Sequence, residues 1–208
     1  NRHIVTVEDP IEVLFADREA IVSQREVGSD TPEVATALRR ISRQDADVVF
    51  VSDLPDAEAV REALGVAAAG RLVIAVLNTL SATDTVSWMI DRFPPHQQGS
   101  ARSLLGRVLR GVVCQRLVDR ADGRGRVAVV ESLVGTPKVR DAIIDGAETP
   151  VLERLVSEGE YHGMATFDQA LFHLFSEEYV SLDEALERAI HPEDFRIAVQ
   201  QAGLATLR

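Results

Sequence analysis

Residues 4–9 read Ile-Val-Thr-Val-Glu-Asp, and residues 48–53 read Val-Val-Phe-Val-Ser-Asp. Each run is apolar, rich in β-branched residues and closed by an acid, which is typical of a strand buried on both faces. A third run at 72–77 follows an alanine-rich segment, 57–69, that ends at Gly70 and is predicted to be a helix. Buried strands that alternate with helices predict an α/β domain with a mostly parallel sheet.

Further elements follow from local signals. Thr31 before Pro32 marks the start of a helix, with Thr31 as its N-cap. Helical spacing predicts helices at 82–92 and 97–118, and residues 126–134 have the pattern of a further strand.

After the last predicted strand only helical signals occur. Pro137 opens a helix, and residues 166–169 and 181–184 have the spacing of capping boxes. The sequence therefore predicts two domains, an α/β domain at 1–135 and a small all-helical bundle at 136–208.

Composition restricts the kind of protein. The net charge is −11, so the surface as a whole repels nucleic acid. No run of about eighteen apolar residues could span a membrane, and no signal peptide is visible. The chain begins at Asn1 on a strand-like segment, which we interpret as a cut from a longer chain. We expect a cytoplasmic protein with no membrane span of its own and no nucleic-acid partner.

Cys114 is the only cysteine, so one chain can form neither an internal disulfide nor a cysteine-based zinc site. It lies in the apolar stretch 112–114, which predicts a buried thiol in a reducing compartment. Arginines are spaced over the predicted helix 97–118 and just beyond it. A solvated helix face or a subunit interface explains them better than nucleic acid does: Arg102, Arg107, Arg110, Arg116 and Arg120.

Polar or acidic residues follow the predicted strands: Glu8 with Asp9, then Asp53, then Asn78 with Thr79. In an open parallel sheet, ligands bind outside the carboxyl ends of the strands, so these groups could converge on one crevice. A carboxylate there could orient a water molecule or hold Mg²⁺ through its water shell. Acidic strand ends are also common where strands simply meet solvent, and position alone leaves both interpretations open.

Several segments, in order along the chain, resemble the motifs of one ATPase superfamily. Residues 7–12, Val-Glu-Asp-Pro-Ile-Glu, resemble the aspartate box of the secretion and pilus ATPases. Residues 45–56 resemble the Walker B stretch, and residues 70–82 resemble the histidine box. The other segments are Gln24-Arg25-Glu26-Val27, Phe93-Pro94 with 102–105 and Gln115, the helical motif opening at 135–140, and Gly163-Met164-Ala165-Thr166-Phe167-Asp168. On these segments the sequence resembles the C-terminal core of type IV pilus retraction ATPases of the PilT family.

The resemblance implies a RecA-like P-loop NTPase core, only part of which lies in this chain. It implies a homo-hexamer in which ATP and Mg²⁺ bind between subunits and hydrolysis drives withdrawal of the pilus. It further implies a cytoplasmic protein, peripheral at the inner membrane, whose partner is the pilus platform protein.

Carried over residue by residue, the resemblance assigns roles at the strand ends. Glu8 matches the proposed general base and Asp53 takes the Walker B position, where either carboxylate could help to hold Mg²⁺. Arg25 falls near the position of an arginine that reaches nucleotide or stabilises the pocket. Asn78 and Thr79 fall in the histidine box and are expected to bind nucleotide. No other metal site is expected, because no histidine has a partner at helical spacing or a nearby cysteine.

Three departures from the family pattern concern the chemistry. No Gly-x-x-x-x-Gly-Lys-Ser/Thr (Walker A) motif occurs in the chain, and its lone lysine, Lys138, lies between proline and valine. Asp53 is one methylene shorter than the usual glutamate. Arg71 and Asn78 stand where the family has histidines. The chain by itself is therefore expected to be inactive as an ATPase, because it lacks the phosphate loop.

Two functions remain open. The parent protein could be a divergent but working retraction motor, which Glu8 and Arg25 favour. It could instead be a degenerate, non-catalytic subunit that forms a ring or docks in a pilus or type II secretion assembly, which the changes at Asp53, Arg71 and Asn78 favour. With one cysteine the chain cannot carry the Cys-x-x-Cys zinc insertion that extension and secretion ATPases generally have, and this favours the retraction branch.

Overall fold

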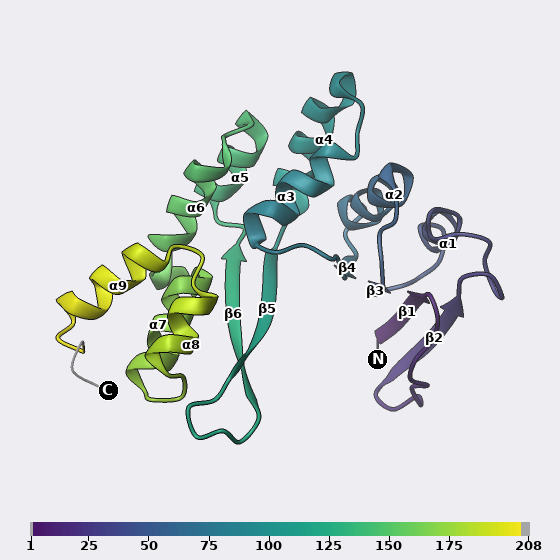
Figure 1. Cartoon of the computed structure of the whole chain (residues 1–208). Helices are drawn as coiled ribbons and strands as arrows, with labels where there is room; N and C mark the ends of the chain where they lie inside the picture. Colours follow the sequence, from purple (N-terminus) through teal and green to yellow (C-terminus); the bar gives the residue numbers. More distant parts are fainter. Residues whose placement is uncertain (1, 205–208) are drawn as a thin grey trace. The chain divides into compact units, whose positions relative to one another are not determined.

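The computed structural model describes residues 2–204, which form two compact units (Figure 1). The first unit contains residues 2–79, 85–109 and 140–146, and the second contains 80–84, 110–139 and 147–204. Helices α3 (Ala82–Asp91) and α5 (Pro137–Asp145) have residues in both units.

The first unit is built on a parallel sheet of four strands. They are β1 (Arg2–Glu8), β2 (Ala20–Glu26), β3 (Val48–Val51) and β4 (Leu72–Ala75), in the spatial order β2-β1-β3-β4. Val7 on β1 pairs with Arg25 on β2 and with Val51 on β3, and Val51 pairs with Ala75 on β4. This parallel pairing confirms the predicted α/β class.

The two central strands supply the core of the first unit. Val5 and Val7 on β1, and Val49 and Val51 on β3, are completely buried, as their β-branched runs predict. Helices α1 (Val34–Ile41) and α2 (Ala57–Ala68) lie side by side against this sheet (Figure 1). A third helix, α4 (Pro95–Val108), packs on α2. Burying such side chains contributes about 1.5–3 kcal/mol each, which stabilises the two central strands.

The start of α1 differs from the prediction. The helix begins at Val34 with Glu33 as its N-cap, rather than at Pro32 with Thr31 as its N-cap. Thr31 instead forms a β-bridge with Val27, and its carbonyl accepts a hydrogen bond from Gly28 N at 2.7 Å. This turn after β2 holds Thr31 out of the helix.

The third predicted strand exists, but it is not buried. Within residues 2–204, β4 pairs with a strand on one side only, namely β3. Leu72, Ile74 and the following Val76 are each almost half exposed, at 49%, 48% and 47%. The apolar run that predicts a fully buried strand thus lies at an edge of the described sheet.

Strand β2 was not expected, because its sequence, Ala-Ile-Val-Ser-Gln-Arg-Glu, has no clear strand period. It forms through pairing with β1 over its whole length, from Arg2↔Ala20 to Glu8↔Glu26. All its residues but Ile21 are half-buried. Tertiary pairing rather than local pattern therefore creates this strand.

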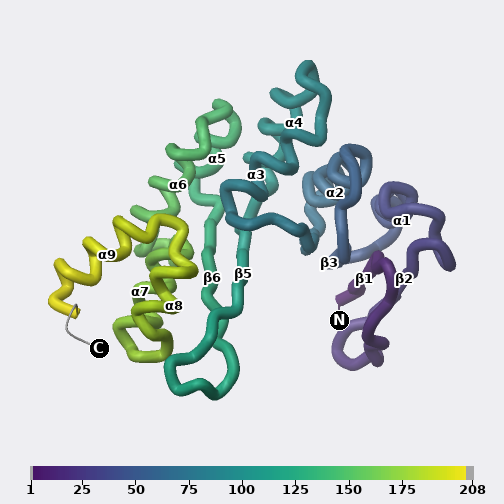
Figure 2. The backbone as a smooth tube through the Cα atoms, in the orientation of Figure 1, coloured from purple at the N-terminus to yellow at the C-terminus, as the bar shows by residue number. Residues whose placement is uncertain are grey.

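The predicted helix 97–118 is wrong in its second half. Helix α4 ends at Val108, and Gly111–Asp119 is strand β5, which pairs antiparallel with β6 (Arg126–Val134) (Figure 2). Along β5 burial alternates, since Cys114 and Val118 are buried while Val113 is 74% exposed. The predicted buried thiol is confirmed, but it lies on a strand. The arginines consequently share no helix face: Arg102 and Arg107 are on α4, Arg110 precedes β5, Arg116 is on β5 and Arg120 follows it.

The second unit combines the β5–β6 hairpin with four helices and one short 3₁₀ helix, η1 (Glu160–His162). The helices are α6 (Thr149–Ser157), α7 (Phe167–Ser176), α8 (Leu182–Arg188) and α9 (Pro192–Gln201). The capping box predicted at 166–169 is confirmed, because Thr166 and Gln169 each accept the other's backbone N–H. Ser181 accepts from Glu184 N at 3.2 Å and caps α8.

The β5–β6 hairpin belongs to the same compact unit as the C-terminal helices, whereas the sequence pattern predicts it in the first domain. The domain limits 1–135 and 136–208 stay a prediction. No helix within residues 2–204 combines the length and apolarity needed to cross a membrane.

Candidate functional site at the carboxyl ends of the parallel strands

The ends of β1, β3 and β4 lie next to one another in the sheet. Glu8 is the last residue of β1, Asp53 follows β3, and Asn78 follows β4. The backbone N–H of Asp9 donates to Ser52 Oγ at 3.1 Å, which joins the segments that leave β1 and β3. Val76 N donates to the carbonyl of Val51 at 3.0 Å, which joins the segments that leave β3 and β4. The polar strand ends that the sequence singles out thus emerge at one edge of the sheet.

Glu8 is a buried carboxylate held by two donors. Its side chain is among the buried polar groups, and the whole residue is 8% exposed. Thr6 Oγ1 donates to Glu8 Oε1 at 2.6 Å, and Gln24 Nε2 donates to the same oxygen at 2.9 Å. Both hydrogen bonds end on Oε1, so they orient the carboxylate and leave Oε2 as the oxygen that can accept from a water molecule.

Gln24 also holds the loop between β1 and β2. Its Nε2 donates to the carbonyl of Val13 at 2.9 Å, and its Oε1 accepts from Phe15 N at 2.8 Å. The side-chain amide of Gln24 therefore connects Glu8 to the loop between β1 and β2, and the tip of this loop is apolar and exposed. The sequence reasoning missed this role, although Gln24 begins one of the family-like segments and lies directly opposite Thr6 in the sheet register.

The structure directs Arg25 away from the carboxylates. Arg25 Nη2 donates to Gln44 Oε1 at 2.9 Å, and Gln44 lies in the segment between α1 and β3. Among residues 2–204, no hydrogen bond links Arg25 with Glu8 or Asp53. The Nη2 group of Arg25 is thus bound to a neutral amide rather than to a carboxylate.

Arg71 hydrogen-bonds to the same segment, between α1 and β3. Its Nη2 donates to the carbonyls of Ser42 and Gln44 at 3.2 and 2.9 Å. Its buried Nε has no hydrogen-bond partner within the part of the chain that the structure describes. Arg71 therefore fastens the chain between α1 and β3.

Asp53 and Asn78 are exposed, and Thr79 is half-buried. The hydroxyls of Thr79 and Thr85 share a hydrogen bond of 2.7 Å. Within residues 2–204, no three His, Cys, Asp or Glu side chains are grouped as a metal site. Mg²⁺ in nucleotide enzymes usually needs only one or two protein carboxylates, because phosphates and water supply the other oxygens. Glu8 and Asp53 fit that kind of ligand set.

Two of the clustered arginines have structural partners in the second unit. Arg116 Nη2 donates to the carbonyl of Leu80 at 2.9 Å, and its guanidinium lies 4.3 Å from the centre of the Phe167 ring. Arg120 donates to both carboxylate oxygens of Asp122, at 3.0 and 2.8 Å. These contacts hold the hairpin and its turn.

The comparisons with known proteins identify the family and the fold. Residues 1–146 match the family model described as Type II/IV secretion system protein. The type IV pilus retraction ATPase PilT of Pseudomonas aeruginosa is 37% identical over 193 residues, which cover 93% of this chain and 56% of that protein. A twitching motility protein of Neisseria gonorrhoeae is 36% identical over 92% of this chain and 51% of its own length.

Solved structures show the same fold. A crystal structure of the pilus retraction motor PilT with bound ADP superimposes with a TM-score of 0.83 at 37% identity, over 93% of this chain and 54% of that one. The ATPase DotB of Legionella pneumophila, at 23% identity, shares the fold with a TM-score of 0.78 over 97% of this chain and 52% of its own. The chain thus spans about half the length of the relatives it matches.

Proposed function

The chain belongs to the family of type II/IV secretion system proteins, and from that premise we propose that it is part of a motor ATPase that drives type IV pilus retraction. The similarity to pilus retraction ATPases supports the choice within the family. The observation that carries the proposal is the buried Glu8 carboxylate, oriented by two donors at the carboxyl end of a central parallel strand. Such a group is suited to activating a water molecule.

Glu8 is the general base in this proposal. Bound ATP supplies the phosphoryl group that a water molecule attacks. Thr6 and Gln24 hold Glu8 Oε1, so the proton of that water passes to Oε2. Because the carboxylate is already oriented, less reorganisation is needed when the water reacts.

The exposed strand ends complete this half of the site. Asp53 would hold Mg²⁺ through water, as a shorter carboxylate than glutamate can. Asn78 and Thr79 would donate to phosphate oxygens. Arg25 would reach nucleotide after leaving Gln44. The phosphate loop is not among these 208 residues, so the chain contributes only the water-activating part of the site.

The test of the proposal uses the longest natural chain that contains residues 1–208. Glu8→Gln should lower the kcat of ATP hydrolysis roughly 10²–10⁴-fold, because the amide cannot accept a proton, while ATP binding is retained. Turnover is measured by phosphate release, and binding is measured with a fluorescent ATP analogue.

The matched control is Glu19→Gln, which neutralises an exposed acid in the loop between β1 and β2. It should turn over ATP at the wild-type rate. Equal turnover in Glu8→Gln and Glu19→Gln would contradict the role of Glu8.

A non-catalytic, ring-forming subunit is the second candidate function. The hydrogen bonds from Arg71 to backbone carbonyls favour this second function, because in this chain the family's histidine position has a structural role. A folded oligomer of the natural chain that binds ATP but hydrolyses none would establish this alternative.

The proposal includes the assembly and its surroundings. A homo-hexamer with ATP between subunits, contact with an inner-membrane platform protein, and a cytoplasmic location at that membrane all follow from the family resemblance. Light scattering of the natural chain with and without ATP tests the hexamer. A mass corresponding to one subunit in both conditions would argue against it.

A further inference from the structure

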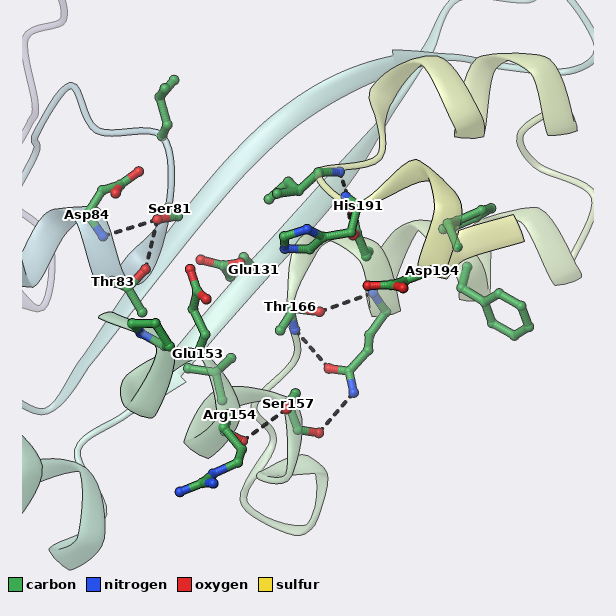
Figure 3. Close-up of a pocket in the computed structure, with 18 of the residues that line it drawn as sticks. Ser81, Thr83, Asp84, Glu131, Glu153, Arg154, Ser157, Thr166, His191 and Asp194 are labelled. Atoms are coloured by element: carbon green, nitrogen blue, oxygen red, sulfur yellow. Dashed lines mark hydrogen bonds between the residues drawn. The ribbon is translucent and has the colours of Figure 1, made fainter. Parts of the chain in front are cut away.

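The second unit contains a pocket that the proposed ATPase site does not use. Its volume is about 670 Å³, within the range of ligand-binding pockets. It is lined by residues from the start of α3, from β5 and β6, and from helices α6, α7 and α9 (Figure 3). All the lining residues belong to the second unit.

The floor of the pocket is apolar. Val156 on α6 and Phe195 on α9 are almost fully buried, and the rings of Phe172 and Phe195 meet edge to face at 5.9 Å between centroids. Ile190 also lines the pocket and remains 43% exposed. This surface can take an aliphatic or aromatic side chain from solvent, and burying one stabilises a complex.

Two of the lining carboxylates already have backbone partners. Glu131 accepts from Ala82 N at 2.6 Å and from Phe167 N at 3.2 Å, at the first residues of α3 and α7. Asp168 accepts from Ile190 N at 2.7 Å and from His191 N at 2.9 Å. Through these hydrogen bonds, Glu131 and Asp168 link the segments that form the walls of the pocket.

Three further carboxylates around the pocket have no such partner. Asp84, Glu153 and Asp194 lie on α3, α6 and α9 and are exposed. Within residues 2–204, the side chain of none of them accepts a hydrogen bond or forms an ion pair. Two arginines, Arg116 and Arg154, line the pocket, against five carboxylates in all. The rim is therefore negatively charged overall.

We propose that this pocket binds a basic peptide segment of another protein, with an apolar side chain on the floor and lysine or arginine side chains against Asp84, Glu153 and Asp194. Among residues 2–204 no three His, Cys, Asp or Glu side chains are grouped closely enough to hold one metal ion, so a single metal ion does not account for the three carboxylates. A peptide carries several cations at once and an apolar anchor between them. This proposal is argued from residues of the second unit alone and does not rest on the proposed ATPase function.

The experiment measures binding of the fluorescein-labelled peptide Lys-Lys-Phe-Lys-Lys to the longest natural chain that contains residues 1–208, by fluorescence anisotropy. The double variant Glu153→Gln/Asp194→Asn should weaken binding about tenfold, because two exposed ion pairs are lost. Ala198→Trp, which fills the pocket, should abolish it. Replacing the phenylalanine of the peptide by glycine should weaken binding at least tenfold, because the anchor is lost.

The matched control is Asp183→Asn/Glu187→Gln, which removes the same charge from exposed positions on α8. It should bind the peptide as the wild type does. Equal weakening in both double variants would mean attraction to the net charge of −11 alone and would overturn the proposal. So would unchanged binding by Ala198→Trp, provided that circular dichroism shows this variant folded, or equal binding of Glu-Glu-Phe-Glu-Glu.

Discussion

The amide of Gln24 shows how one residue can join a candidate catalytic group to a surface loop. It donates to Glu8 Oε1 and to the carbonyl of Val13, and it accepts from Phe15 N. The loop tip exposes Leu14 at 83% and Phe15 at 59%, so anything that contacts this tip can act on Glu8 through a single side chain. Gln24 is thus a positioning residue for the proposed base.

Gln24→Leu should lower the kcat of ATP hydrolysis by the natural chain about ten- to hundredfold with ATP binding unchanged, because Glu8 loses an orienting donor. Gln24→Glu places a second carboxylate beside Glu8, and repulsion between the two negative charges should move the acidic limb of the kcat profile to higher pH. Phosphate release measured across pH tests both.

Gln201→Leu, at an exposed position of α9, is the control and should leave the profile unchanged. A merely structural role for Gln24 predicts lower stability without a shift of the pH profile, so an unshifted profile in Gln24→Glu would reject the positioning role.

Among the elements of the second unit, two helices depend on one strand residue. Glu131 on β6 accepts the first backbone N–H of both α3 and α7 and is only 6% exposed. Helix N-termini leave unpaired N–H groups, and a carboxylate there also complements the helix dipole. This carboxylate stabilises both helix starts at once.

Glu131→Ala should therefore lower the free energy of unfolding by about 2–4 kcal/mol, because two buried N–H groups lose their acceptor. Urea denaturation followed by circular dichroism measures the change. Glu158→Ala, at the exposed C-cap of α6, should change stability by less than about 0.5 kcal/mol. Similar values for the two variants would show that Glu131 is not a cap.

The carboxyl group of Asp122, in the turn between β5 and β6, has a lowered pKa. Hydrogen bonds from the Arg120 guanidinium, and then from Arg124 N, lower the pKa of Asp122 from 3.8 to about 2. Since the folded-state pKa lies below the unfolded one, the charged form favours the fold above about pH 4, and this contribution is lost as the pH falls toward 2.

A carbon-detected NMR titration should place the Asp122 midpoint near 2 in the wild type. In Arg120→Gln the midpoint should rise toward the ordinary value of 3.8, because the largest cause of the shift is removed. A midpoint that Arg120→Gln leaves unchanged would show that the ion pair does not form in solution.

For the whole molecule, the proposed function depends on which parts of an ATPase site occur in its 208 residues. The carboxyl ends of the parallel strands carry the acids, while no phosphate-binding loop occurs in the 208 residues. A RecA-like site needs both, because a base without bound phosphate has no substrate to act on.

The chain of residues 1–208 alone should accordingly turn over ATP no faster than its own Glu8→Gln variant. The longest natural chain that contains these residues should exceed both. Phosphate release from the purified proteins tests this. Turnover by residues 1–208 that Glu8→Gln abolishes would reveal a phosphate site that the sequence does not show.

Elements with local signals were correctly predicted from the amino-acid sequence. The β-branched runs at 4–7 and 48–51 became the buried strands β1 and β3, and the Thr166 capping box formed as its spacing predicts. The order of family-like segments likewise indicated a family that the comparisons confirm. Local signals suffice in these cases because the period, the cap and the motif lie within a few residues of one another.

Other features depend on tertiary contacts. The β5 segment, expected to be helical, pairs with β6, and β4, expected to be buried, lies at an edge of the described sheet. Gln24 reaches Glu8 and Arg25 reaches Gln44 only because β2 pairs with β1, a pairing that no local pattern announces. Strand pairing and side-chain partners depend on residues far apart in the chain, so burial and orientation at the site are settled by long-range contacts rather than by local sequence.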